Sequence, residues 1–242
     1  MEVPKEVRLI RLECGKANAI DLRLLKTLKD GLEAARADGV RAVVLTGYDQ
    51  FFSAGLNLKS LPDSREGMTD FVQKFEGGLR HLLTFPLPVV AAINGHAIAG
   101  GCVFASACDL RLAVEGSYKI GLSEVDVGLP FPGLALAVMK SAISNRWLTE
   151  LVLGARLVSP SEATEVGIVH AVVPPEGLLD EAIARALRLG AKPQPAFRLT
   201  KEAMHRDSLD RVEAVAFETR KHFLDCWFSE AVRKRRAALL KR

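Results

Sequence analysis

Residues 51–59 read FFSAGLNLK, and residues 89–101 read VVAAINGHAIAGG. Each stretch joins an apolar run typical of a buried strand, AVVLTG at 42–47 and VVAAI at 89–93, to a turn built of small residues. The second turn opens a helix, and a helix N-terminus presents unpaired N–H groups and the positive end of its dipole. The two turns together predict an oxyanion hole for a carbonyl oxygen that gains negative charge. Glycines that serve only tight turns and close helix packing would give the same local pattern.

Strands and helices alternate on both sides of these stretches. Strands are expected over 7–13, 40–46, 89–93, 110–114 and 168–173. Asp21 is expected to cap a helix whose leucines recur every three or four residues, and a second amphipathic helix is expected before Pro86. From about residue 147 the pattern is mainly helical. We therefore expect an α/β catalytic core over residues 1–190 and a C-terminal helical assembly region over 191–242.

The composition argues against several classes of protein. Of 242 residues, 49% are hydrophobic and 26% are charged, as in a folded globular chain. Six of the 33 basic residues lie in the last ten positions, and the remaining 27 are balanced by 29 acidic residues, so we expect a solvated helix end rather than a nucleic-acid-binding surface. No apolar run reaches the roughly 18 residues of a membrane span, and no secretion signal begins the chain, so the expected location is the cytoplasm. The four cysteines form no CxxC pair and the five histidines show no ligand spacing, which predicts reduced thiols and no metal site.

Three motifs together resemble one known family. The segments FFSAGLNLKSL at 51–61, PVVAAINGHAIAGGC at 88–102 and IGLSEVDVGL at 120–129 are similar to the crotonase superfamily, the enoyl-CoA hydratases and isomerases. The resemblance extends over residues 7–220. It implies an α/β spiral of ββα units with a C-terminal helical subdomain, and a homotrimer or hexamer. It also implies an acyl-CoA substrate, with coenzyme A bound as part of that substrate and no tightly bound cofactor.

The same resemblance assigns binding residues. It places the thioester carbonyl between the backbone N–H groups of Leu56 and Gly100. The CoA chain is expected along Ala54, Leu56, Asn57, Leu58 and Lys59. Lys59 would lie beside a phosphate. Asn57 departs from the Asp that is usual in this turn, and an Asn changes the charge while keeping the local hydrogen bonds.

One missing carboxylate is the most informative feature of the chain. Hydratases of this family hold a water between two glutamates, one just after the GG turn and one after the next strand. Here the first position is Val103 and the second is Glu124. Because valine can neither orient a water nor exchange a proton, the resemblance favours the isomerases that keep only the second glutamate. Glu124 would then carry a proton from C2 to C4 of a 3-enoyl-CoA while the oxyanion hole holds the dienolate.

Other functions stay open on sequence alone. An enoyl-CoA hydratase, or another enolate-handling lyase or hydrolase, would need a replacement acid such as Asp70 or Glu76. In a non-catalytic acyl-CoA-binding or RNA-binding homologue, Glu124 would be an ordinary capping or surface carboxylate. His96 is expected to be a turn residue and Asp126 a solvent-facing carboxylate. The acyl end of the site is expected at Phe131, Pro132 and Gly133.

Overall fold

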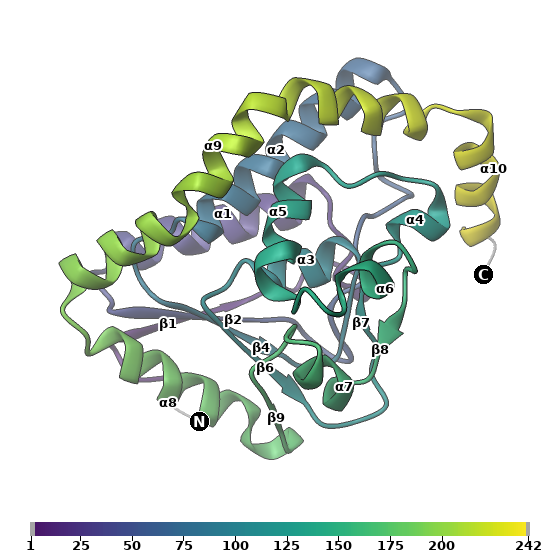
Figure 1. The fold of residues 1–242 in the computed structure, drawn as a ribbon. Coiled ribbons are helices and arrows are strands. Elements are labelled where there is room, and N and C mark those ends of the chain that lie inside the picture. The colour runs from purple at the N-terminus through teal and green to yellow at the C-terminus, as the bar shows by residue number, and fades with distance from the viewer. Residues whose placement is uncertain (1–2, 241–242) are drawn as a thin grey trace.

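A parallel sheet of five strands is the larger of two sheets in the protein (Figure 1). The structure, a computed structural model, describes residues 3–240. The strand order is β1-β2-β4-β6-β9, and every neighbouring pair is parallel. Every residue of β2 and β4 is buried, which explains why their sequences are almost continuously apolar. The strands are β1 (Val7–Arg11), β2 (Ala42–Thr46), β4 (Val89–Ile93), β6 (Leu110–Val114) and β9 (Ala171–Val173).

A smaller sheet is built from segments that follow the large-sheet strands. Its order is β3-β5-β7-β8, with three parallel strands and an antiparallel β8. The strands are β3 (Phe51–Ser53), β5 (His96–Ile98), β7 (Ile120–Gly121) and β8 (Leu157–Val158). Each of β3, β5 and β7 comes shortly after a strand of the large sheet and before a helix. The chain therefore repeats the predicted ββα unit, within the expected α/β class.

Helices cover both faces of the large sheet. The helices are α1 (Leu22–Ala37), α2 (Arg65–Leu83), α3 (Gly100–Ser106), α4 (Glu124–Val127), α5 (Gly133–Ala142), α6 (Leu148–Val152), α7 (Pro160–Glu165), α8 (Leu178–Gly190), α9 (Gln194–Trp227) and α10 (Glu230–Leu239). The main core joins one face of the sheet to α1, α2, α3 and α5, and α8 packs against the other face. As predicted, Asp21 caps α1, because its carboxylate accepts hydrogen bonds from the N–H groups of Arg23 and Leu24, both at 3.0 Å.

Three sequence-based strand boundaries differ from the structure. The strand predicted over 40–46 begins at Ala42. The strand predicted over 168–173 is shorter. The N–H of Val169 donates to the carbonyl of Ala163 in α7, so it is not bonded to a neighbouring strand, and the strand is limited to the residues of β9. The strand predicted over 7–13 ends at Arg11. In addition, α5 was not predicted, because apolar residues occupy every position from 134 to 139, so the sequence shows little contrast between the buried and the outer side of the helix.

The C-terminal helices wrap around the core. The 34-residue helix α9 runs across the molecule and packs against α2 and α5, and α10 turns back to contact α4 (Figure 1). A buried ion pair joins α9 to the sheet, with Lys201 Nζ 2.8 Å from Asp109 Oδ2. The predicted division at residue 190 coincides with the end of α8, just before the short connection to α9. Its meaning as a boundary between a core and an assembly region stays a prediction.

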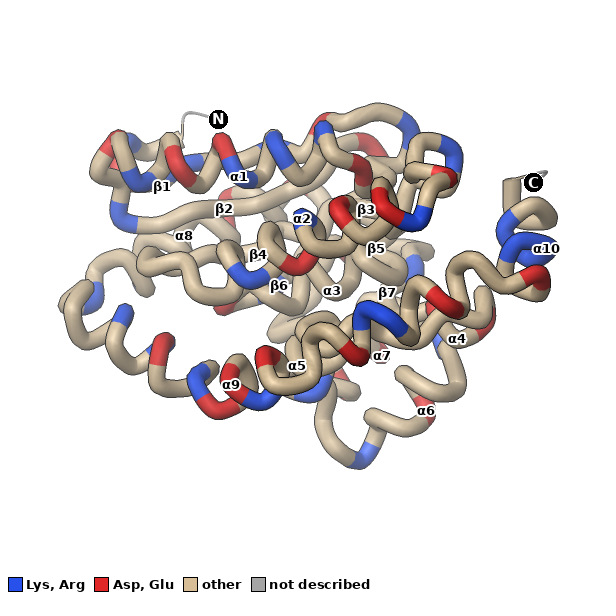
Figure 2. The backbone as a smooth tube through the Cα atoms, turned by 90° about the horizontal axis from the view of Figure 1, so that it is seen from above, with Lys and Arg blue, Asp and Glu red and all other residues tan. Residues whose placement is uncertain are grey.

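The surface charge is mixed except at the C-terminal helix. Figure 2 shows acidic and basic residues interspersed along α1 and α9, and basic residues gathered on α10. Four of the six cations at the end of the sequence lie on α10, whereas Lys241 and Arg242 lie outside the described residues. Arg235 Nη1 donates to the carbonyl of Asp126 at 2.6 Å, so α10 is bound to the core. No helix within residues 3–240 is long and apolar enough to cross a membrane.

Candidate active site

A cavity of about 260 Å³ lies where the two small-residue turns meet the helices that cover the large sheet. Leu56, Gly100 and Glu124, the three predicted catalytic positions, all line it. The remaining walls come from α2, α3, α5, α9, α10 and the segment that contains α4, and they are apolar apart from Ser123. Glu124 is therefore the one ionisable side chain among the described residues that line the cavity.

The backbone amides of Leu56 and Gly100 lie in adjacent turns. Gly55 has φ +87°, and a Cβ placed on it would lie 2.9 Å from the Cβ of Ala99 and 3.5 Å from the amide nitrogen of Gly100. Ile20 holds the first turn on both sides of Leu56. The N–H of Ile20 donates to the carbonyl of Gly55, and its carbonyl accepts from the N–H of Asn57. Within residues 3–240, neither the Leu56 nor the Gly100 N–H donates to a protein acceptor. Both donors are therefore available to a ligand.

The start of α3 is fixed by a strained residue and a close backbone contact. Ala99 precedes the helix with φ 52° and ψ −128°, a conformation that L-residues rarely adopt. It makes Gly100 the first residue of α3, where the amide has no acceptor in the preceding turn. Gly101 passes so close to β3 that a Cβ there would lie 2.2 Å from the carbonyl oxygen of Ser53. The position of the Gly100 amide is thus set by the conformation of Ala99 and by the contact of α3 with the small sheet.

Glu124 begins the short helix α4 and is half-buried beside the cavity. One of its carboxylate oxygens, Oε2, accepts a hydrogen bond from the backbone N–H of Ser123 at 2.9 Å. Burial among apolar side chains raises the pKa of Glu124 to about 7, although hydrogen bonds from backbone amides act in the opposite direction. A carboxyl group with this pKa can both accept and release a proton near neutral pH.

Val103 lies three residues after Gly100, on the first turn of α3. Its side chain is buried and lines the cavity with Leu56 and Glu124. The wall at this point is therefore a hydrocarbon surface. A water here would find no carboxylate on the α3 side to orient it.

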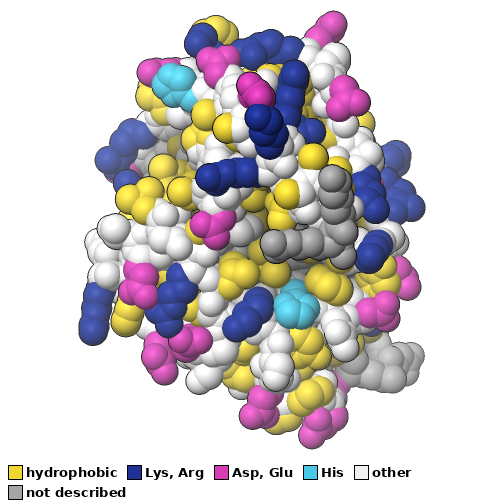
Figure 3. Space-filling view, turned by 90° about the vertical axis from the view of Figure 1, so that its right-hand side faces the viewer, with side chains coloured by type: hydrophobic (Ala, Val, Ile, Leu, Met, Phe, Trp, Pro, Cys, Tyr) yellow, Lys and Arg dark blue, Asp and Glu magenta, His cyan; other side chains and the backbone are white. Residues whose placement is uncertain are grey.

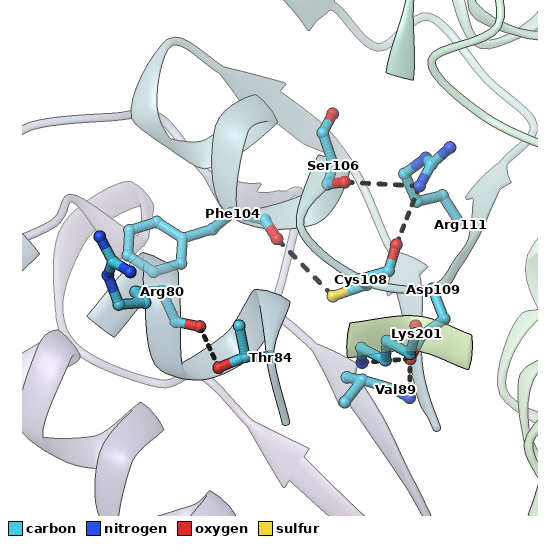
Figure 4. Close-up of polar contacts among 9 residues, drawn as sticks. All are labelled: Arg80, Thr84, Val89, Phe104, Ser106, Cys108, Asp109, Arg111 and Lys201. Atoms are coloured by element: carbon cyan, nitrogen blue, oxygen red, sulfur yellow. Dashed lines mark hydrogen bonds and ion pairs between the residues drawn. The ribbon is translucent and has the colours of Figure 1, made fainter. Parts of the chain in front are cut away.

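The other end of α3 is held by a buried guanidinium (Figure 4). Arg111 donates from Nε to the carbonyl of Ile168 and from Nη1 to the carbonyl of Cys108 at 2.9 Å. A weaker contact at 3.5 Å joins Nη1 to the carbonyl of Ser106, the last residue of α3. A cation at a helix C-terminus stabilises the helix dipole, so Arg111 supports α3 from the end opposite the cavity.

A family comparison agrees with this geometry. Residues 2–239 match the family model described as enoyl-CoA hydratase/isomerase. The chain belongs to this family, the crotonases. Its activity therefore falls among the reactions that these enzymes carry out on acyl-CoA thioesters.

Relatives in the crotonase family carry both kinds of name. A probable enoyl-CoA hydratase of Rhizobium meliloti is 33% identical over 224 residues, which cover 91% of this chain and 86% of the relative. The enoyl-CoA delta isomerase 3 of Arabidopsis thaliana is 34% identical over 173 residues, 66% of this chain and 71% of the relative. The crystal structure of human mitochondrial delta3-delta2-enoyl-CoA isomerase superposes with a TM-score of 0.93 at 28% identity, covering 98% of this chain and 94% of that one. The predicted crotonase fold is thus confirmed.

The predicted CoA-binding residues of this crotonase divide into two groups. Ala54, Leu56 and Leu58 line the cavity, whereas Lys59 is exposed outside it. The side-chain amide of Asn57 donates to Asp21 Oδ2 at 3.2 Å, the carboxylate that caps α1. An Asp at position 57 would instead face a like charge, which gives a physical reason for Asn in this chain.

Two other candidates, His96 and Asp126, do not line the cavity. His96 accepts a hydrogen bond from the N–H of Lys119 at 3.0 Å and packs against the ring of Phe51. His96 begins strand β5, so the expectation of a turn residue is wrong, because this position pairs with β3 in the small sheet. Asp126 is exposed, as expected.

The residues expected at the acyl end of the site lie at or beside the cavity. Phe131 and Pro132 line the cavity, and Gly133 begins α5 beside it.

The two candidate replacement acids do not line the cavity. Glu76 Oε2 lies 3.5 Å from Arg220 Nε of α9, and Asp70 pairs with Lys74 one turn later at 2.6 Å. Burial raises the pKa of Glu76, while Arg220 acts to lower it. Both acids therefore face other partners on α2 and α9, and neither restores the carboxylate missing at Val103.

The C-terminal helices supply two cavity residues that were not identified from the sequence. Phe223 of α9 and Leu239 of α10 line the cavity from the C-terminal helices. Neither lies in a motif. Phe223 is placed by the packing of α9 against α2 and α5, and Leu239 by the turn between α9 and α10. Helical periodicity alone gives no signal for such a long-range contact.

Proposed function

We propose that this crotonase shifts the double bond of a 3-enoyl-CoA to the 2 position, with Glu124 as the single base. One observation carries the proposal: of residues 3–240, one ionisable side chain, Glu124, lines the cavity, in apolar surroundings and next to two amides that donate to no acceptor within that range. Isomerisation requires one group that removes a proton and returns it. The reaction adds nothing to the substrate, so no second carboxylate is needed to activate water.

In the proposed reaction, the thioester oxygen accepts hydrogen bonds from the N–H groups of Leu56 and Gly100. Glu124 removes a proton from C2, and the electron pair of that C–H bond moves toward the thioester oxygen to form a dienolate. The two amides stabilise the negative charge that develops on the oxygen. The dienolate then takes the proton from Glu124 at C4, which leaves the double bond between C2 and C3 and Glu124 ionised again.

Hydration is the alternative within the family. Its support is that relatives such as the crotonyl-CoA hydratase of Syntrophomonas wolfei, 31% identical over 228 residues, carry that name. Against it stands the hydrocarbon wall at Val103, because hydration requires a water held and deprotonated beside the double bond. We therefore rank isomerisation first.

The proposal also covers the binding of the CoA chain, the location of the protein and its assembly. We propose that the CoA chain passes Ala54, Leu56, Asn57 and Leu58, with Lys59 near a phosphate in solvent. The protein would work in the cytoplasm as a homotrimer or hexamer and would have no role in nucleic-acid binding. Light scattering on the purified protein gives the mass of the assembly, and a monomer would contradict the proposed oligomer.

A product assay across thioester classes tests the reaction type. The purified protein is incubated with 3-hexenoyl-CoA, with crotonyl-CoA and with 3-hydroxybutyryl-CoA, and products are separated by chromatography. We expect 2-hexenoyl-CoA from the first substrate and little conversion of the other two. Rapid hydration of crotonyl-CoA with unchanged 3-hexenoyl-CoA would reverse the ranking.

A further inference from the structure

The C-terminal helix contributes one apolar side chain to the active-site cavity. Leu239, the last residue of α10, lines the cavity together with Phe223 of α9. Phe223 is buried at 4% exposure, whereas Leu239 is 42% exposed. Figure 3 views the side of the molecule that carries α10 and shows hydrophobic side chains exposed among Lys and Arg side chains. Leu239 therefore presents apolar surface at the edge of the cavity that a ligand could still bury.

Contacts with the catalytic segment fix the position of α10. Val232 is buried at 3% exposure and packs against the turn that ends α4, where a Cβ on Gly128 would lie 3.1 Å from Val232 Cγ2. Arg235 adds the 2.6 Å hydrogen bond to the carbonyl of Asp126. Because α4 begins with Glu124, Leu239 is held at a defined distance from the proposed base.

The order of residues around the cavity suggests a path for the acyl chain. The carbonyl lies at Leu56 and Gly100 in the proposed reaction, and carbons 2 to 4 lie beside Glu124. Carbons beyond C4 must continue along apolar wall, which α4 and the loop after it supply with Val127 and Leu129. That wall ends at α10, because α4 and α10 are in contact.

We propose that Leu239 is a chain-length determinant of this enzyme, and that its substrates are medium-chain acyl-CoA thioesters whose distal methylenes cover Leu239. The inference rests on the proposed function for the position of the thioester, but not for the reaction that follows binding. A short acyl group ends near Glu124 and does not reach α10. A longer chain buries the exposed surface of Leu239 and gains affinity from it.

Binding of saturated acyl-CoAs tests this inference without any reaction. Calorimetry would measure butyryl-CoA, octanoyl-CoA and lauroyl-CoA with the wild type, Leu239→Ala and Leu240→Ala. Leu240 is a matched control, because it is the adjacent residue, has the same 42% exposure and does not line the cavity. Burial of one methylene is worth about 4-fold in affinity, so Leu239→Ala should weaken lauroyl-CoA about 4- to 15-fold. Octanoyl-CoA should weaken by the same factor or less, and butyryl-CoA should bind equally to all three proteins.

Three outcomes would overturn the inference. Equal losses for butyryl-CoA and lauroyl-CoA would place Leu239 against the CoA portion instead. No loss for any chain, or the same loss in Leu240→Ala, would remove Leu239 from the site. Leu239→Met should keep most of the lauroyl-CoA affinity, since it preserves the apolar surface. A chain-length effect without turnover of 3-hexenoyl-CoA would reject the proposed reaction while leaving the role of Leu239 intact.

Discussion

At the scale of single residues, Glu124 determines the pH dependence of the proposed reaction. The carboxylate must be ionised to remove a proton, and its pKa is raised to about 7 by burial. We expect kcat/KM for 3-hexenoyl-CoA to rise with pH through one ionisation near pH 7 and then to level off. A steady-state profile between about pH 5 and 9 measures this. A profile that is already nearly level from pH 5 upward, as the ordinary value of 4.5 would give, would contradict the raised pKa.

The same carboxyl group makes a prediction about stability. The pKa in the folded state lies above the ordinary value of 4.5, so the folded protein holds this proton more tightly than the unfolded chain. The contribution of Glu124 to stability is present below pH 4.5 and is lost as pH rises through about 7. Glu124→Gln should therefore raise the free energy of unfolding at pH 8, by at most about 3 kcal/mol, with a smaller difference at pH 4.5. Urea unfolding at the two pH values measures it, and a less stable variant at pH 8 would contradict the expected sign.

The residues that could be predicted from sequence share one property. Leu56, Gly100, Val103 and Glu124 lie within a few residues of a motif turn, so local order along the chain determines their positions, and all four line one cavity. Leu239 differs because its place depends on the α9–α10 turn and on packing against α4. No local pattern carries that information.

At the scale of elements, the contact between α3 and β3 predicts a sharp difference between two glycines. A Cβ on Gly101 would lie 2.2 Å from the backbone oxygen of Ser53, so Gly101→Ala must separate α3 from β3 and should lower the free energy of unfolding by at least about 3 kcal/mol. A Cβ on Gly77 in α2 meets nothing within 4 Å, and Gly77→Ala should stabilise the protein by about 0.5–1 kcal/mol. Thermal or urea unfolding of both variants measures the contrast. Equal effects would reject the close approach at Gly101.

Elements with strong periodicity or continuous apolar runs were the predictable ones. The strand predicted over 89–93 coincides with β4, and the caps and leucine spacing of α1 were visible in the sequence. The small sheet was not visible, because strands of two or three residues give no alternation. Its register depends on the large sheet that precedes each of its first three strands.

At the scale of the whole molecule, one buried ion pair links the C-terminal helices to the sheet. Lys201 of α9 is buried against Asp109, which also accepts a hydrogen bond from the N–H of Val89 at 2.8 Å (Figure 4). Lys201→Met would leave a buried carboxylate without its cation and should cost about 3–5 kcal/mol of unfolding free energy. The control Lys26→Met removes an exposed pair with Asp30 and should cost less than about 1 kcal/mol. Equal losses in chemical denaturation would show that α9 is not held to the sheet in this way.

The central claim is that one carboxylate, Glu124, performs the proton transfer beside two amide donors. The most direct test compares conversion of 3-hexenoyl-CoA to 2-hexenoyl-CoA by the wild type and by Glu124→Gln, with octanoyl-CoA affinity as the control for an intact site. We expect kcat to fall by roughly 10²- to 10⁴-fold while octanoyl-CoA affinity stays unchanged or rises slightly. Turnover by Glu124→Gln at the wild-type rate, with the same product, would contradict the claim.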